Sequence, residues 1–164
     1  MKKIFLVFII VFTSCNFNNP TEFSEKALQE MLIDVNDSKL TFREVLHYKK
    51  GKKILIDVWA SWCPDCIRDI PKIKELQKDF PNVEFVFLSV DRSNPSWKRA
   101  IKKYNLKGDH YNLPKGMNEG DFVDFVNLNW ISRFMVIDEK GKIQLFKATK
   151  ATDKEITEAL KNEL

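Results

Sequence analysis

The sequence predicts an α/β domain in which a central mixed β-sheet is flanked by helices. Residues 54–60 and 83–90 are apolar at almost every position, which is typical of central strands buried on both faces. Each run is followed by a segment with helical spacing, and two further strands precede a final helix. This order of elements indicates a sheet with both parallel and antiparallel strands.

The elements before the first buried strand are less regular. Residues 22–33 have apolar positions at helical spacing, so we expect a helix there. "NDSK", starting at Asn36, is a turn signal, and Gly51 separates this region from the strand over 54–60.

The middle of the chain predicts two helices. Residues 64–80 have a proline in the first turn, where it is tolerated, and Pro71, which should kink the helix. Residues 95–104 have one apolar face and predict a second helix. We expect residues 105–120 to form a loop and 121–126 a short helix.

The C-terminal part predicts a hairpin and a helix. The strands over 133–138 and 142–147 flank "EKGK", a hairpin signal. The last helix is expected to open at Thr152, with Glu155 three residues on completing a capping box.

Length, composition and charge bound the function. The chain has 164 residues, 44% hydrophobic and 30% charged, which suits one soluble globular domain rather than a disordered tail or a membrane bundle. The formal net charge is +4, with basic and acidic residues interspersed and no basic stripe. Charge therefore gives no indication of nucleic-acid binding.

The N-terminus predicts export. "MKKIFLVFIIVFTSC" has two lysines and then nine apolar residues, too few to span a membrane but right for the apolar core of a secretory signal. Residues 12–14 before Cys15 resemble a bacterial lipoprotein processing site, in which the cysteine becomes the lipidated first residue. A plain signal peptide with Cys15 as a free thiol is the alternative. We expect a lipoprotein signal over 1–15, a short tether over 16–21 and one domain over 22–164.

Cys63 and Cys66 are placed for redox chemistry. Cys63 lies at the junction of a buried strand and a helix, whose free N–H groups and partial positive charge stabilise a thiolate. Cys66 shares one face of the first turn, so a disulfide forms without a large backbone movement. The exposed thiolate of Cys63 would attack a substrate disulfide, and Cys66 would resolve the mixed disulfide.

Metal and haem sites fit less well. A structural zinc site needs four ligands, and beyond the two cysteines the chain offers only His47, His110 and Cys15. A c-type haem site needs a histidine where Ile67 follows the second cysteine. A purely structural disulfide would not need the strand-to-helix position. We therefore expect no metal and no cofactor.

The segment "DVWASWCPDC", with Pro71 five residues beyond the second cysteine, closely resembles the active-site segment of the thioredoxin superfamily. The nearest branch is the exported TlpA/ResA-like proteins. The resemblance extends to the hairpin-like lead-in before Ile54, to "FLSVD" from Phe87 and to "RFMVIDEKGKI" from Arg133.

The resemblance implies a thioredoxin-like fold and a thiol-disulfide oxidoreductase. It makes Cys63 the nucleophile and Cys66 the resolving thiol. Pro64 lies between them in the sequence, and Trp59 and Trp62 flank the site. Trp97 and Trp130 are most simply core or groove aromatics, and His110 an ordinary surface histidine rather than a catalytic base.

Two aspartates bear on the chemistry. Asp57 falls where thioredoxins have a buried aspartate, whose raised pKa lets it take a proton from the resolving thiol; pairing with Lys52 or Lys53 is the alternative. Asp65, at ~7 Å from the Cys63 sulfur, would cost its thiolate about 0.6–2.4 kcal/mol. That makes the pair more reducing and favours a reductase, although Asp65 is also a favourable first-turn acid.

Ser132 is a departure from the family pattern. Thioredoxin-fold proteins usually have a cis-proline at this position, facing the disulfide. A non-proline cis bond costs about 2.5–4 kcal/mol, so we expect a trans Ile131–Ser132 bond and a reshaped groove. Two hypotheses follow: altered pairing of the substrate backbone beside Ile131, and access of a metal to the two thiols.

Together these observations predict an exported, lipid-anchored protein on the periplasmic side of the bacterial cell envelope. It would reduce disulfides in exported proteins or in apocytochromes awaiting haem, with electrons from a membrane thiol-transfer protein. A disulfide oxidase or isomerase is one alternative. The other is a non-catalytic metal- or protein-binding module on a thioredoxin fold.

Overall fold

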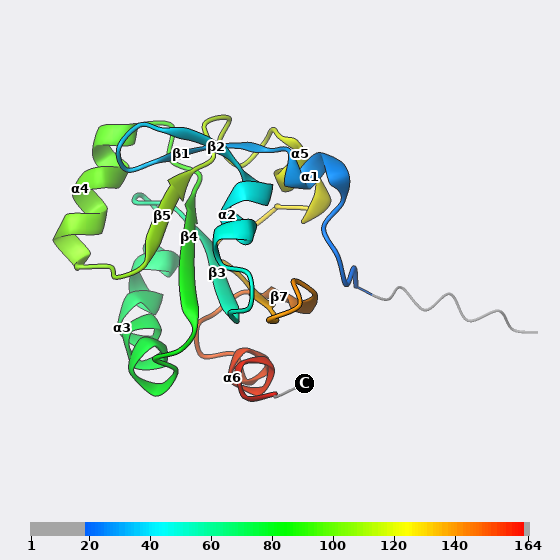
Figure 1. Ribbon diagram of the computed structural model, residues 1–164. Coiled ribbons are helices and arrows are strands. Elements are labelled where there is room, and N and C mark those ends of the chain that lie inside the picture. Colours follow the sequence, from blue (N-terminus) through cyan, green and yellow to red (C-terminus); the bar gives the residue numbers. More distant parts are fainter. Residues whose placement is uncertain (1–18, 163–164) are drawn as a thin grey trace, which may run out of the picture.

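The computed structural model describes residues 19–162 (Figure 1). The predicted signal over 1–15 and the first part of the tether, 16–18, lie outside the described residues. In chain order the elements are α1 (Glu25–Leu28), β1 (Met31–Asp34), β2 (Lys39–Thr41), α2 (Phe42–Tyr48), β3 (Ile54–Trp59), α3 (Pro64–Asp79), β4 (Glu84–Ser89), α4 (Asn94–Tyr104), β5 (Asp109–Asn112), α5 (Asp121–Phe125), β6 (Arg133–Ile137), β7 (Ile143–Ala148) and α6 (Lys154–Lys161).

One mixed sheet of seven strands runs through the domain in the order β2-β1-β5-β4-β3-β6-β7 (Figure 1). β3 lies between β4, to which it is parallel, and β6, to which it is antiparallel. All six residues of β3 are buried. The predicted α/β class, the mixed sheet and the flanking helices are confirmed.

The helices cover the sheet with their apolar residues. The buried residues of the three longest helices are Cys66, Ile70, Ile73 and Leu76 of α3, Trp97 and Ala100 of α4, and Ile156, Ala159 and Leu160 of α6. These side chains join those of β3, β4 and β6 in one hydrophobic core. Within residues 19–162, no helix has both the length and the apolar character needed to cross a membrane.

The predicted helix over 22–33 is wrong beyond its first turn. α1 ends after four residues, and the chain continues as β1, which pairs with β2 across the turn predicted from "NDSK". Leu32 is fully buried and lies opposite Leu40 in this hairpin. The apolar spacing of the segment thus comes from two short elements that face the same core.

The predicted loop over 105–120 contains a strand. β5 is parallel to β4 and antiparallel to β1, so it joins the N-terminal hairpin to the rest of the sheet. Its four residues, Asp-His-Tyr-Asn, have no strand pattern of their own, and the strand exists because both neighbours supply hydrogen-bond partners.

The predicted capping box of the last helix does not form. α6 begins at Lys154, and Asp153 is its N-cap residue. The Asp153 carboxylate instead accepts hydrogen bonds from the backbone N–H groups of Thr149 and Lys150, at 2.9 and 3.1 Å. The carboxylate therefore closes the turn that follows β7.

Candidate active site

The two cysteines occupy the junction of β3 and α3. Cys63 has an extended backbone and is the N-cap residue of α3, with Pro64 in the first turn. Its Sγ accepts a hydrogen bond from the backbone N–H of Cys66 at 3.2 Å. A sulfur in this position receives a free N–H group and the positive end of the helix dipole, both of which favour a thiolate.

Cys63 and Cys66 form a disulfide, with their Cα atoms 5.3 Å apart. Cys63 is 4% exposed and Cys66 is 2% exposed. The prediction of an exposed Cys63 sulfur is therefore wrong for the disulfide form. The loop before β6 covers this sulfur. The carbonyl oxygen of Ile131 lies 3.8 Å from Cys63 Sγ.

The Ile131–Ser132 peptide bond is cis, so the expectation of a trans bond is wrong. The preference of an isolated peptide does not decide the isomer here, since both residues are buried against the disulfide. The serine hydroxyl donates a hydrogen bond to Asp69 Oδ2 at 3.4 Å, a contact that a proline could not make.

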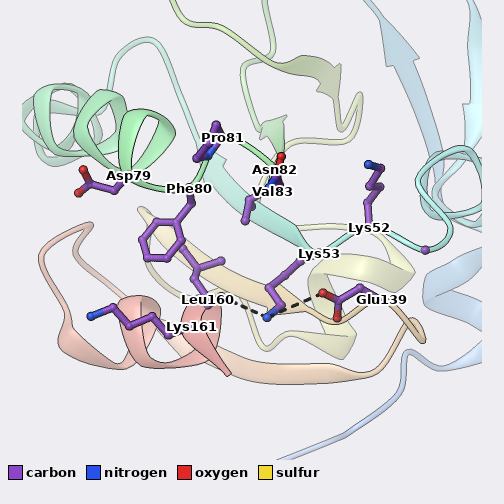
Figure 2. Close-up of a pocket in the computed structure, with 11 residues that line it drawn as sticks. Lys52, Lys53, Asp79, Phe80, Pro81, Asn82, Val83, Glu139, Leu160 and Lys161 are labelled. Carbon is purple, nitrogen blue, oxygen red and sulfur yellow. Dashed lines mark hydrogen bonds and ion pairs between the residues drawn. The ribbon is translucent and has the colours of Figure 1, made fainter. Parts of the chain in front are cut away.

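Asp57 is buried in the middle of β3, and its Oδ1 has no hydrogen-bond partner within residues 19–162. Burial, and then the charge of Asp69, raise the pKa of the Asp57 carboxyl well above its ordinary value. Neither lysine neutralises it. The Lys53 amine bonds to the backbone oxygens of Leu160 and Asn162 (Figure 2 shows it pointing toward Leu160), and Lys52 is exposed.

Asp69 is a site residue that the sequence reasoning missed. Burial raises its pKa, while hydrogen bonds from the backbone of Ala151 and from Ser132 act in the opposite direction. Its position, three residues after Cys66 and therefore on the same face of α3, is the signal that could have found it. Asp57 and Asp69 thus form a pair of acids in which the charge of Asp69 raises the pKa of Asp57.

Asp65, between the cysteines, forms an ion pair with Arg68 on the next turn. Its side chain is 40% exposed, and solvent and Arg68 together screen its charge. Its effect on the Cys63 thiolate is therefore near the lower end of the predicted range.

A buried network that the sequence did not predict fixes the loop before Cys63. The Asp91 carboxylate accepts hydrogen bonds from the backbone N–H and hydroxyl of Ser61 and from the hydroxyl of Ser89. The Asn112 amide donates to the backbone oxygens of Asp91 and Ser89, at 2.8 and 3.2 Å. The carboxyl ends of β4 and β5 thus hold the β3–α3 loop in place.

Two tryptophans that precede site residues in the sequence are open to solvent. Trp62, before Cys63, and Trp130, before Ile131, are each 58% exposed. A hollow of about 440 Å³ borders Trp62 and is also lined by Asp91 and Met117. Trp59, by contrast, is buried in β3, so it supports the site from within the core.

His110 and Trp97 lie in the core. The His110 ring stacks on Phe87 at 4.8 Å, its Nε2 lies 3.1 Å from the carbonyl oxygen of Leu106, and burial lowers its pKa. The expectation of a surface histidine is therefore wrong, because β5 carries the residue into the sheet. Trp97 is fully buried in α4.

Comparisons with known proteins agree with this geometry. A family model described as thioredoxin-like matches residues 51–143. The thioredoxin-like protein YneN of Bacillus subtilis is 27% identical over 98% of this chain and 95% of its own length. The thiol-disulfide oxidoreductase ResA of Bacillus thuringiensis is 23% identical over 74% of this chain and 67% of its own length.

Solved structures give the same result. A Bacteroides vulgatus protein described as a thiol-disulfide oxidoreductase is 32% identical, covers 84% of this chain and 87% of its own, and superposes with a TM-score of 0.67. A secreted disulfide oxidoreductase of Mycobacterium tuberculosis shares the fold, with a TM-score of 0.63 and 19% identity over 84% of this chain and 98% of its own. The chain therefore belongs to the thioredoxin-like family and, within it, to the thiol-disulfide oxidoreductases.

Proposed function

We propose that the Cys63–Cys66 pair reduces disulfides in exported proteins of the bacterial cell envelope. The observation that carries the proposal is the position of Cys63, whose sulfur caps α3 and is bonded to Cys66 three residues on. The buried Asp57 carboxyl, with its raised pKa, adds a proton acceptor behind the pair.

In the proposed reaction the Cys63 thiolate attacks one sulfur of the substrate disulfide, and the other substrate sulfur leaves as a thiolate. The Cys66 thiol then gives its proton to Asp57 and attacks the Cys63 sulfur. This step forms the Cys63–Cys66 bond and releases the second substrate sulfur. The substrate gains two electrons and the enzyme loses two.

The acids around the pair support the reducing direction. Asp65 places negative charge near the sulfurs, which disfavours a thiolate and therefore the reduced form. Asp57 and Asp69, whose pKa values are raised, add to this effect only once they ionise. A less stable reduced form corresponds to a lower reduction potential.

The N-terminal sequence supports the proposed location. The apolar segment before Cys15 would export the chain and attach it by a lipid to a membrane on the periplasmic side. Exported proteins with disulfides, including apocytochromes awaiting haem, would be the substrates. A membrane thiol-transfer protein would supply the two electrons that regenerate the dithiol.

The reduction potential of the Cys63–Cys66 pair, measured on the full chain against a glutathione or dithiothreitol buffer, tests this direction. A value near or below that of thioredoxin, roughly −270 mV, is expected for a reductase. A value near about −120 mV, as in a strong oxidant, would contradict the proposal and favour disulfide insertion.

A further inference from the structure

Two loops with exposed lysines meet at the end of the sheet opposite the disulfide. One loop precedes β3 and contains Lys50 and Lys52; the other is the β6–β7 turn, which contains Lys140. All three are exposed, and none makes an ion pair with any residue of the range 19–162. We call these three lysines the basic face.

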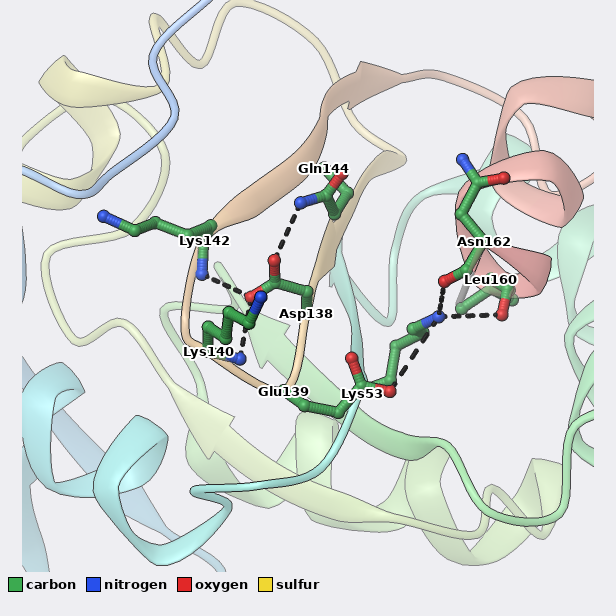
Figure 3. A network of polar contacts seen from close by, with 8 residues as sticks. All are labelled: Lys53, Asp138, Glu139, Lys140, Lys142, Gln144, Leu160 and Asn162. Atoms are coloured by element: carbon green, nitrogen blue, oxygen red, sulfur yellow. Dashed lines mark hydrogen bonds and ion pairs between the residues drawn. The ribbon is translucent and has the colours of Figure 1, made fainter. Parts of the chain in front are cut away.

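The acids that border the basic face are largely engaged elsewhere. Asp138 is buried, and it accepts hydrogen bonds from the backbone N–H groups of Lys140 and Lys142 and from the side chain of Gln144 (Figure 3). Glu139 lies 4.0 Å from the amine of Lys53.

The acids farther from the basic face also have partners. Glu84 and Asp109 both pair with Lys49. Glu25 pairs with Arg43, and Glu22 with Lys142. Asp79 makes no ion pair with any residue of the range 19–162, and it lies across a hollow of about 670 Å³ that Lys52 also lines (Figure 2). The charge that remains open to a partner at the basic face is therefore positive.

The surface between the two loops is hollowed and has an exposed aromatic beside it. A hollow of about 290 Å³ is lined by more basic than acidic side chains: Lys49, Lys50, Lys52, Lys140, Arg43 and His47, against Asp138 and Glu139. Such a concave, cation-lined surface suits a phosphate group. Tyr48, which ends α2 next to Lys49, is 71% exposed, and an aromatic ring with a polar tip is typical of a side chain at a membrane interface.

The chain enters the domain beside this face. The backbone oxygen of Thr21 accepts a hydrogen bond from Ile143 N–H at 2.8 Å, and Ile143 begins the strand that follows the β6–β7 turn. In Figure 1 the N-terminal segment accordingly approaches the domain on the side where β7 lies. A membrane anchor preceding residue 19 would therefore bring the basic face, rather than the disulfide, next to the bilayer.

The disulfide lies at the other end of the same strand. β3 runs from the lysine loop to Trp59, and six residues of strand span on the order of 20 Å. A domain resting on the basic face would thus hold the Cys63–Cys66 pair away from the membrane, open to partners in the surrounding space.

We propose that the basic face docks on the anionic phospholipid surface of the membrane, with phosphate headgroups in the hollow between the two lysine loops. The inference rests on the proposed envelope location, and it adds an orientation that the N-terminal anchor alone does not provide. Juxtamembrane lysines gain free energy near an anionic leaflet and lose it as salt is raised.

The test uses the full chain bound to vesicles of phosphatidylcholine alone or mixed with phosphatidylglycerol. Acetylation of each lysine by a water-soluble reagent is followed by mass spectrometry. On anionic vesicles we expect several-fold slower acetylation of Lys50, Lys52 and Lys140, and recovery at high salt. The exposed lysines Lys102 and Lys103, in α4, and Lys154, which begins α6, should react equally on both vesicles. If neither set of lysines reacted more slowly on anionic than on neutral vesicles, the proposal would be overturned. It would also be overturned if both sets were protected to the same extent.

Matched variants give a second readout. Lys50→Gln/Lys52→Gln/Lys140→Gln should lose the preference for anionic over neutral vesicles, which at about 1 kcal/mol per lysine is on the order of 100-fold for three. Lys102→Gln/Lys103→Gln/Lys154→Gln, with the same change in net charge, should keep it. A similar loss in both would show that only net charge matters. Protection of the three lysines by inorganic phosphate on neutral vesicles would identify a soluble phosphate site and overturn membrane docking.

These outcomes are separate from those of the proposed function. Failure to bind neutral vesicles would count against the lipid anchor, while the comparison of the two triple variants on anionic vesicles would still decide the docking. Loss of thiol-disulfide exchange in solution would count against the redox proposal alone.

Discussion

Two regions of the same segment, the residue before β3 and the middle of β3, each contain a buried ionisable side chain, and the two side chains have opposite surroundings. Lys53, 7% exposed, precedes the strand and donates to the backbone oxygens of Leu160 and Asn162 at 3.1 and 2.6 Å. Asp57, 5% exposed, lies near the disulfide, and its Oδ1 has no hydrogen-bond partner among the described residues. A buried ionisable group with hydrogen-bond partners stabilises the fold. One without partners has a shifted pKa, which suits it to proton transfer.

The largest effect is expected from the cysteines themselves. Cys63→Ser should abolish reduction of insulin disulfides, because no thiolate remains to attack the substrate. Cys66→Ser should retain the attack and accumulate a mixed disulfide, which non-reducing electrophoresis would show. Mixed disulfides that formed through Cys66 in the Cys63→Ser variant would reverse the assigned roles.

Asp57→Asn tests the unpartnered end of the comparison. The variant should slow resolution of the mixed disulfide by about 10²–10⁴-fold, as for loss of a proton acceptor. Stopped-flow measurement of the resolving step over a range of pH would check this. The wild-type rate should rise as Asp57 ionises, and the variant should lose that rise.

The same variant should change the pH dependence of stability. Because the folded-state pKa of Asp57 is raised, the native state binds its proton more tightly than the unfolded state does. The wild type should therefore lose stability as pH rises from the ordinary carboxyl range toward the raised pKa. Asp57→Asn should reduce this loss in urea titrations of the disulfide form. An unchanged pH dependence would show that Asp57 is not held in a raised-pKa state.

Lys53→Met tests the partnered end. Two backbone oxygens would lose a buried donor, so we expect a loss of about 1–3 kcal/mol in the free energy of unfolding. The rate of thiol-disulfide exchange should stay unchanged. Lys52→Met, at an exposed neighbour, is the matched control and should change stability by less than about 0.5 kcal/mol. A slower exchange in Lys53→Met would show that Lys53 also affects the redox reaction, and not stability alone.

Ser132→Ala should have the smallest effect. Loss of the hydrogen bond to Asp69 should cost about 0.5–1.5 kcal/mol of stability and shift the pKa of Asp69 further upward, since that bond favours the ionised carboxyl. An NMR titration of the Asp69 carboxyl checks the direction. A downward shift would show that the serine acts on Asp69 in another way.

The sequence predicted the parts of the molecule that local patterns determine. The runs that form β3 and β4, the helical spacing of α3 and α4, and the Cys63–Cys66 pair all depend on residues close together in the chain. β5 was not predicted because its strand conformation depends on β1 and β4, which flank it.

The candidate site shows the same limit. Asp57 was predicted by resemblance, but its lack of a partner follows from where the Lys53 amine points, which only the packed α6 determines. Asp91 ends the segment "FLSVD", which the sequence indicated. Its hydrogen bond from Ser61 was not predicted, because it links two loops 30 residues apart. The isomer of the Ile131–Ser132 bond is likewise set by tertiary contacts, which sequence preference does not report.

The network around Asp91 has a consequence for the speed of electron transfer to substrates. It ties the loop before Cys63 to the ends of β4 and β5, and the Cys63 sulfur is held by the first turn of α3. The sulfur atoms can therefore make and break their bond against a backbone that stays still. We therefore expect the rate of exchange with a substrate disulfide to depend on how the partner docks rather than on movement of the site's own loops.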